Sequence, residues 1–171
     1  MAVDGWFGNE TDADSYNRVY GNIVAQRHQN NIGAGKVIEM KYKGGLGASD
    51  VRLGIYADSS GSIGSLLLDA GEKALASNAG WTSWTGLNLD VADDAYYWLV
   101  ATAEVNHYAR TAGSTTAVKY AAFAYSTLPS TFPTPITDHV YQTCLMAGVE
   151  LSGGGPLAVG AYVSTTVVMG F

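Results

Sequence analysis

The sequence predicts an all-β protein, an antiparallel β-sandwich that is jelly-roll-like and has about nine to ten strands. The first observation is alternation, because apolar and polar residues repeat with a period of two along many short segments. The second is punctuation, since turns containing glycine, aspartate and asparagine separate those segments. The third is composition: only 14% of the 171 residues are charged, which is typical of β-sheet proteins with weakly charged surfaces.

Three segments show the alternation most clearly, and each fits a strand with one buried face. They are KVIEMKYK at 36–43, VRLGIYAD at 51–58 and YYWLVATAEVNHY at 96–108. Other strands are expected at 20–28, 64–69, 81–89, 117–126, 140–150 and 157–170, with a turn at 111–114. The best helical candidate, residues 71–80, is very short, so strands follow one another without helices between them.

The chain length favours a single domain over residues 1–171. Residues 1–18 are expected to form a polar N-terminal arm. Residues 129–137 include three prolines and are expected to form a connector, because proline cannot donate to a sheet ladder. Residues 138–171 then supply strands that complete the same sandwich or are exchanged with a neighbour in a homo-oligomer.

Charge and composition exclude several classes of function. The net charge is −6 and the nine basic residues are scattered singly, so no basic stripe is present to bind nucleic acid. No apolar run is long enough for membrane insertion. The single cysteine, Cys144, allows no internal disulfide. The N-terminal residues lack the features of a signal peptide, and we expect a virion or extracellular location.

The segment from Val51 to Ala101 resembles a known kind of module. Its successive parts are VRLGIYADSSGSIGSLLLDAGE, GWTSWTGLNLDV and YYWLVA. They are similar to a β-sandwich module that recurs in phage and virion tail and surface proteins and in secreted bacterial proteins, and that resembles carbohydrate-binding modules. The resemblance extends over residues 20–126 and ends before Pro129. It implies a structural, adhesive or carbohydrate-binding unit.

Few residues suggest catalysis, so we do not expect an enzyme. The histidines are far apart in the sequence, no serine lies in a G-x-S-x-G elbow, and most carboxylates fall in predicted turns. No cofactor is expected. Asn9, Glu10, Asp12 and Asp14 provide oxygen ligands at close spacing and could hold a structural Ca²⁺, the alternative being a plain polar arm.

The tryptophans are the strongest candidates for ligand binding, and strand parity divides them. If residues 81–89 form one regular strand, Trp81 shares the apolar face and is predicted to be core, whereas Trp84 is predicted to be exposed. A bulge at Gly86 would reverse this parity on one side. Trp98 lies opposite the apolar face of its own strand. The predicted ligand-binding residues are Trp84, Trp98, Tyr108, Asn88 and Asp90.

These observations lead to three functional hypotheses. The favoured one is a non-catalytic carbohydrate-binding module or adhesin of viral or bacterial-surface origin, whose aromatic side chains stack on a polysaccharide or cell-surface glycan. The alternative is a structural virion protein, a capsid decoration or fibre subunit, in which the same aromatics serve packing or a subunit interface. The third is a polysaccharide hydrolase or lyase built on a jelly roll.

Overall fold

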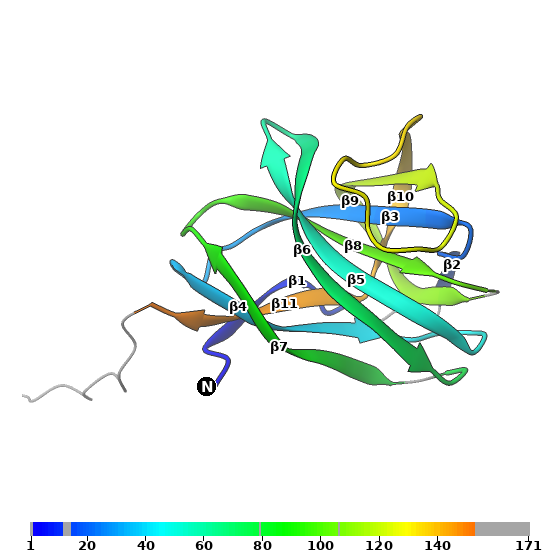
Figure 1. The fold of residues 1–171 in the computed structure, drawn as a ribbon, viewed down its shortest axis with the longest axis horizontal. Helices are drawn as coiled ribbons and strands as arrows, with labels where there is room; N and C mark the ends of the chain where they lie inside the picture. Colours follow the sequence, from blue (N-terminus) through cyan, green and yellow to red (C-terminus); the bar gives the residue numbers. More distant parts are fainter. Residues whose placement is uncertain (1, 12–14, 79, 106, 153–171) are drawn as a thin grey trace, which may run out of the picture.

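The computed structural model describes residues 2–11, 15–78, 80–105 and 107–152. Their regular structure consists of eleven strands, and this part of the chain has no helix of the length and apolarity that a membrane crossing needs. Figure 1 shows the strands arranged in layers. The strands are β1 (Gly5–Asn9), β2 (Ser15–Arg18), β3 (Asn22–Gln29), β4 (Gly35–Lys43), β5 (Ser49–Ser59), β6 (Ser62–Leu75), β7 (Trp81–Val91), β8 (Tyr96–Ala103), β9 (Tyr108–Ala122), β10 (Thr137–Thr143) and β11 (Leu145–Leu151).

The strands form two antiparallel sheets. The smaller sheet has four strands in the order β1-β11-β4-β7, and the larger has seven, with the order β10-β9-β3-β8-β5-β6 and with β2 paired to β9. Without β2, β9 and β10, the strand order is that of a jelly roll, in which the chain passes repeatedly between two four-stranded sheets. The predicted all-β, jelly-roll-like sandwich is therefore confirmed.

Several predicted elements differ from the structure. The predicted polar arm contains β1 and β2, because its residues 5–9 pair with β11 and contribute Phe7 to the core. The predicted turn at 111–114 lies within β9, whose residues there pair with β10. The predicted strand at 140–150 is interrupted at Cys144, where the chain passes from the larger sheet to the smaller. The predicted strand at 157–170 lies outside the described residues.

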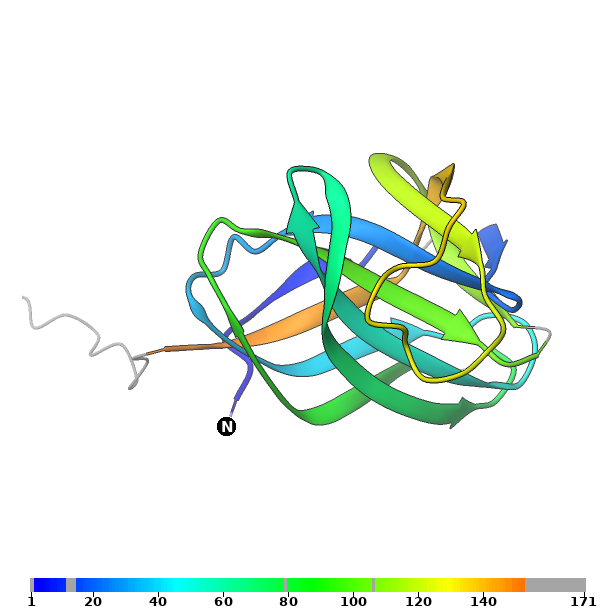
Figure 2. The same ribbon diagram turned by 45° about the horizontal axis from the view of Figure 1, so that its top comes forward.

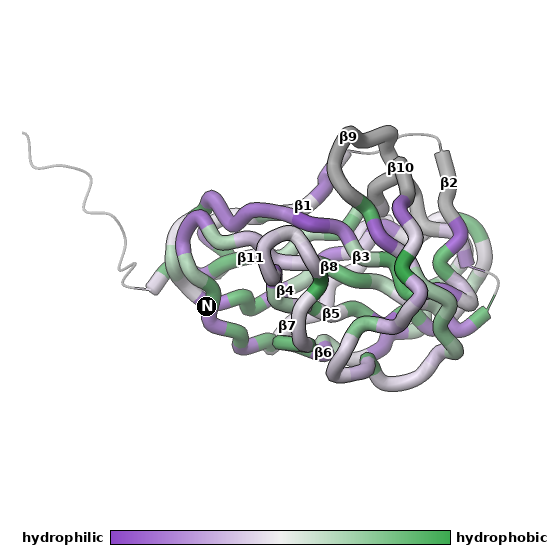
Figure 3. Tube along the Cα trace, turned by 90° about the horizontal axis from the view of Figure 1, so that it is seen from above, coloured by the Kyte–Doolittle hydropathy of each residue, from purple (hydrophilic) through white to green (hydrophobic). Residues whose placement is uncertain are grey.

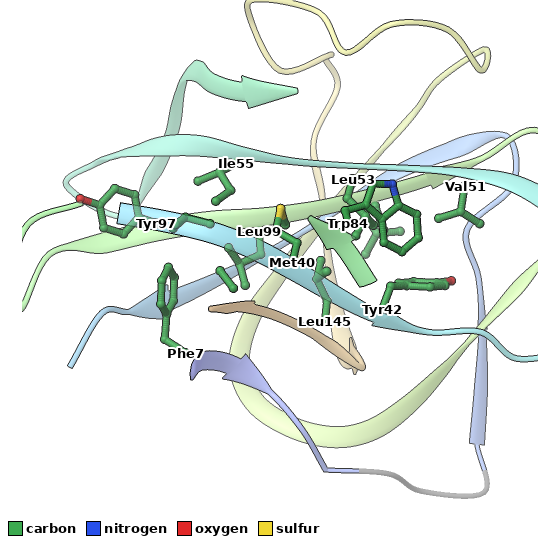
Figure 4. Close-up of a cluster of buried hydrophobic side chains, with 14 of the residues drawn as sticks. Phe7, Met40, Tyr42, Val51, Leu53, Ile55, Trp84, Tyr97, Leu99 and Leu145 are labelled. Atoms are coloured by element: carbon green, nitrogen blue, oxygen red, sulfur yellow. The ribbon is translucent and has the colours of Figure 1, made fainter. Parts of the chain in front are cut away.

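The main core lies between the two sheets. It includes Met40 and Tyr42 from β4 and Leu53 from β5, all fully buried. Figure 4 shows these side chains around Trp84 of β7. Figure 3 shows β5 and β8 in the middle of the molecule, with green, hydrophobic stretches near their labels. The period-two alternation of these strands thus corresponds to a buried inner face.

A second core covers the outer face of the larger sheet. Outward residues of β3, β5 and β8 pack under the segment between β9 and β10, which contributes Leu128 and Phe132. The Phe132 and Tyr56 rings meet edge-on with their centroids 5.7 Å apart, and the Tyr56 hydroxyl donates a 2.6 Å hydrogen bond to the Pro129 carbonyl oxygen. This proline-rich connector, residues 123–136, begins earlier than the predicted 129–137, and Figures 1 and 2 show it mostly in yellow, folded over the larger sheet. The connector is therefore part of the hydrophobic structure.

Candidate functional site

Trp84 is buried in the main core, so its predicted exposure is wrong. Its side chain is 2% exposed and stands edge-on to the Tyr42 ring at a centroid distance of 6.5 Å. Its indole N–H donates a 3.1 Å hydrogen bond to the Gly71 carbonyl oxygen. Figure 4 shows Trp84 beside Tyr42, Val51 and Leu53. A ring in this position has no free face on which a sugar could stack.

A bulge in β7 explains the error. Between two paired positions β7 advances from Thr85 to Leu89 while β4 advances by only two residues. Gly86 lies in this segment with a φ of +76°, which glycine adopts without steric cost. Trp84 before the bulge and Leu89 after it therefore both face the main core, although a regular strand would turn residues five positions apart to opposite faces. Trp81, predicted to be core, is instead turned outward and 37% exposed.

Trp98 is also buried, although it lies on the face that parity predicted. Its side chain points away from the main core, but the connector covers that face and encloses Trp98 in the second core. The indole N–H donates hydrogen bonds to an Asp58 carboxylate oxygen at 2.9 Å and to the Ser62 carbonyl oxygen at 3.2 Å. Hydrogen bonds from Arg27 hold the pKa of the Asp58 carboxyl below its usual value. This cluster has a structural role, and the predicted exposure of Trp98 is wrong.

The other three predicted site residues lie at two separate places, one on each sheet. Tyr108 begins β9 in the larger sheet and stands edge-on to Tyr20, with the ring centroids 5.6 Å apart. Asn88 and Asp90 are exposed on β7, and their side-chain oxygens lie 2.9 and 2.8 Å from the Lys36 ammonium. The structure therefore does not bring the predicted residues together into one site.

A different pair of tryptophans lines a pocket on the outer face of the smaller sheet. Trp6 comes from β1 and Trp81 from β7, the two edge strands of that sheet. Lys41 of β4 and Met146 of β11, which are paired in the sheet, lie between them. Glu10 completes the lining, and the hollow has a volume of about 260 Å³. We call this site the Trp6–Trp81 pocket.

Two neighbours fix the position of the Trp6 ring. Trp6 pairs with Gly148 of β11, and a Cβ built on that glycine would lie 2.9 Å from two atoms of the indole ring. The absence of a side chain on Gly148 thus lets the ring lie against the sheet. The Lys41 ammonium is 4.0 Å from the Trp6 ring centroid, a cation–π distance, and 3.9 Å from a carboxylate oxygen of Glu39.

The pocket combines aromatic surface with charged groups of both signs. Trp81 is 37% exposed, Trp6 is partly exposed and Glu10 is exposed. The indole rings present apolar faces, the Lys41 ammonium donates hydrogen bonds and the Glu10 carboxylate accepts them. Such a set of groups can hold a ligand that has an apolar face and a rim of hydroxyls.

A second hollow, of about 240 Å³, lies beside the bulge of β7. Glu39 of β4 and Thr85 of β7, which are paired in the sheet, contribute to its lining. Ile38, Gly86 and Leu87 complete it. We call this site the bulge pocket. It is next to the Trp6–Trp81 pocket, because the Glu39 carboxylate of one approaches the Lys41 ammonium of the other.

No metal centre is formed within the residues that the structure describes, since no group of three or more His, Cys, Asp or Glu side chains there could hold an ion. Asn9, a predicted calcium ligand, is buried, and its amide donates a 3.2 Å hydrogen bond to the Thr143 carbonyl oxygen. Glu10 lines the Trp6–Trp81 pocket instead. Asp12 and Asp14 lie outside the described residues.

The fold and the pocket together define a jelly-roll protein with an aromatic pocket on the outer face of its smaller sheet. Comparison of the chain with protein-family models, curated proteins and solved structures found no match.

Two signals in the sequence point to this pocket. Gly86 is the position at which strand parity can reverse, and reversing it moves Trp84 inward and Trp81 outward. The Trp-Phe pair at positions 6 and 7 fits a strand with Phe7 in the core and Trp6 on the outer face. Lys41 and Glu10 belong to no recognisable sequence motif. They could not be assigned to the pocket from the sequence, because only the pairing of four strands brings them near the tryptophans.

Proposed function

We propose that this protein is a non-catalytic carbohydrate-binding module or adhesin, of viral or bacterial-surface origin, that binds glycan in the Trp6–Trp81 pocket. One observation carries the proposal: two partly exposed tryptophans lie around a pocket that also contains Lys41 and Glu10. The resemblance of residues 51–101 to carbohydrate-binding modules supports the same class of function. The expected binding surface moves from Trp84 and Trp98 to this pocket, because a stacking residue must be accessible.

The pocket has the chemistry that a sugar ring requires. A pyranose presents C–H groups on its faces and hydroxyls around its edge, so it can stack on the apolar face of Trp81 while its hydroxyls reach charged side chains. Hydrogen bonds to charged groups such as Glu10 and Lys41 contribute about 1.5–3 kcal/mol each. The volume of about 260 Å³ is close to the lower end of the usual range for ligand pockets, which suits a single ring.

Lys41 limits how much of Trp6 a sugar can use. Its ammonium already lies 4.0 Å from the Trp6 ring centroid. A cation–π contact at an exposed site contributes about 0.5–1 kcal/mol, so a sugar that stacks on this face has to displace the ammonium at that cost. We therefore assign the main stacking role to Trp81 and a supporting role to Trp6.

Affinity gel electrophoresis tests the proposal with soluble xylan, galactomannan, mixed-linkage β-glucan and alginate in the gel. We expect at least one of these polysaccharides to retard the protein, and Trp81→Ala to weaken the binding by about tenfold or more, because aromatic anchors are typical hot spots. Tyr96→Ala is the matched control, since this tyrosine is 40% exposed but lies on the larger sheet. It should bind like the wild type.

Two results would reject the proposal. One is a protein that none of the polysaccharides retards and that shows no binding on a glycan array. The other is retardation that Trp81→Ala and Trp6→Ala leave unchanged, with both variants shown to be folded by circular dichroism. Either result would favour the alternative of a structural virion subunit, for which the mass of the protein in solution is the next measurement.

A further inference from the structure

We infer that the outer face of the smaller sheet binds a chain of at least two neutral sugar residues, one in the Trp6–Trp81 pocket and the next in the bulge pocket. This inference rests on the proposed function and adds the ligand class: an internal stretch of a neutral polysaccharide rather than a single terminal sugar.

The two pockets are neighbours along the same two strands. Lys41 in the first pocket and Glu39 in the second are two residues apart on β4, a rise of about 7 Å. Trp81 and Thr85 are four residues apart on β7, about 13 Å along the strand. Both spacings are at least as long as one sugar ring, so the two hollows have room for different rings of one chain that runs along the strands.

The lining of the bulge pocket suits a second sugar ring. The Thr85 hydroxyl can both donate and accept a hydrogen bond, and the Glu39 carboxylate accepts two or more. Ile38 and Leu87 supply apolar surface on the same hollow. Thr85 is exposed and the side chain of Glu39 is 21% exposed, so both polar groups are accessible to a ligand.

The charges of the two pockets favour a neutral ligand. Their titratable lining residues are Glu10, Lys41 and Glu39, which sum to a charge of −1. The Lys41 ammonium is 3.9 Å from the Glu39 carboxylate, so its charge is already partly balanced. An acidic sugar would meet two carboxylates for one ammonium, and like charges at short range oppose binding.

The bulge is the structural cause of the second hollow. The extra residues of β7 around Gly86 interrupt the regular ladder with β4 between Val37 and Glu39. Bulges of this kind are common beside functional sites, where they redirect side chains. A Cβ built on Gly86 meets no atom within 4 Å, so the space beside the bulge is open. The same irregularity thus exposes Trp81 and creates a place for the next sugar.

Isothermal titration with oligosaccharides of one to six residues tests this inference. The probes are prepared from whichever of xylan, galactomannan or β-glucan retards the wild-type protein most strongly. We expect the affinity to rise by about tenfold or more between one and three residues, because the second ring gains hydrogen bonds to Thr85 and Glu39. Alginate oligosaccharides of the same lengths should bind more weakly.

Two variants separate the pockets. Thr85→Val with Glu39→Gln should reduce the affinity for the trisaccharide to near that for the monosaccharide, while the monosaccharide affinity changes by less than twofold. Trp81→Ala should weaken binding at every length. Thr127→Val, an exposed threonine in the connector, is the matched control and should change neither.

The outcomes distinguish the inference from the proposed function. If affinity does not depend on chain length, or the Thr85→Val, Glu39→Gln variant behaves as the wild type while Trp81→Ala does not, the second subsite is rejected and the proposed function stands. Stronger binding of alginate than of the neutral oligosaccharides rejects the neutral ligand class. If no polysaccharide binds, both proposals are rejected together.

Discussion

Trp81 and Trp84 are three positions apart on one strand, so alternation turns them to opposite faces, and one is 37% exposed and the other 2%. The bulge around Gly86 decides which of the two is buried, because it sets the inward side of β7 separately on its two sides. Trp98 shows a second way in which a residue can lose its expected exposure, because a loop covers it and its indole N–H binds Asp58. The exposure of a tryptophan side chain in this protein therefore depends on strand pairing and on contacts with residues that are distant in the sequence.

The hydrogen bond from Trp98 to Asp58 gives a prediction for stability. Trp98→Phe keeps most of the apolar ring but removes the indole donor from a largely buried carboxylate. Hydrogen bonds to charged groups contribute about 1.5–3 kcal/mol, so we expect the free energy of unfolding in urea to fall by about 2 kcal/mol. Trp81→Phe, at the exposed site, should change it by less than about 0.5 kcal/mol. Equal effects of the two substitutions would contradict the assigned burial.

The proline-rich connector is the element whose role differs most from a simple link. It carries no regular strand across most of its length, but Leu128 and Phe132 form the roof of the second core over β3, β5 and β8. The Tyr56 hydroxyl fixes it through the Pro129 carbonyl oxygen. Because of this cover, both faces of β8 are buried.

Removing one side chain of the connector tests this role. Phe132→Ala should lower the free energy of unfolding by about 3 kcal/mol, the usual cost of truncating a buried phenylalanine. Ile136→Ala, which truncates an exposed residue of the same segment, should cost less than about 0.5 kcal/mol. Chemical denaturation of the two variants makes the comparison. If the free energy of unfolding falls by the same small amount in both variants, the connector does not cover the sheet.

Local sequence patterns predict which residues form the strands of this fold better than they predict which side chains are exposed on its surface. Alternation locates β4, β5 and β8 because each has a continuous buried inner face, and it is sufficient for the fold class. The same period fails to place Trp81 and Trp84, since a bulge changes parity without changing composition. It cannot anticipate the cover over Trp98, because the covering residues are about thirty positions away. The Trp6–Trp81 pocket depends on the pairing of four strands, which the sequence pattern does not specify.

The molecule as a whole has one half-buried and one buried histidine, His28 and His107, that link its stability to pH. Burial lowers the pKa of His28 from 6.5 to about 4, and its Nε2 has no hydrogen-bond partner among the residues that the structure describes. Burial also lowers the pKa of His107, whose ring nitrogens lie 2.6 Å from the Gly47 carbonyl oxygen and 3.1 Å from the Tyr42 hydroxyl. Both imidazoles are neutral in the folded protein, whereas the unfolded chain binds protons below pH 6.5. Stability is therefore fully present above that pH and decreases as the pH falls.

A variant of His28 isolates its share of this dependence. The pKa of His28 is 6.5 in the unfolded chain and about 4 in the folded protein. Its protonation alone should therefore lower the free energy of unfolding by about 2 kcal/mol between pH 7 and pH 4.5. We expect His28→Leu to show a correspondingly smaller loss over that range in urea titrations at several pH values. Gln29→Leu, at the exposed neighbouring position, should keep the pH dependence of the wild type. If His28→Leu keeps the same slope as the wild type, the imidazole is not buried in its neutral form.

We propose that the whole molecule binds glycan across the outer face of its smaller sheet, at Trp6 and Trp81. The four indole N–H resonances in a ¹H–¹⁵N NMR spectrum test it most directly, with each assigned by a single Trp→Phe variant. On titration with the retarding polysaccharide's oligosaccharides, the signals of Trp6 and Trp81 should shift, while those of Trp84 and Trp98, bonded to Gly71 and Asp58 in the two cores, should stay in place. Shifts confined to Trp84 and Trp98, or an unchanged spectrum with a glycan known to bind, would contradict the account.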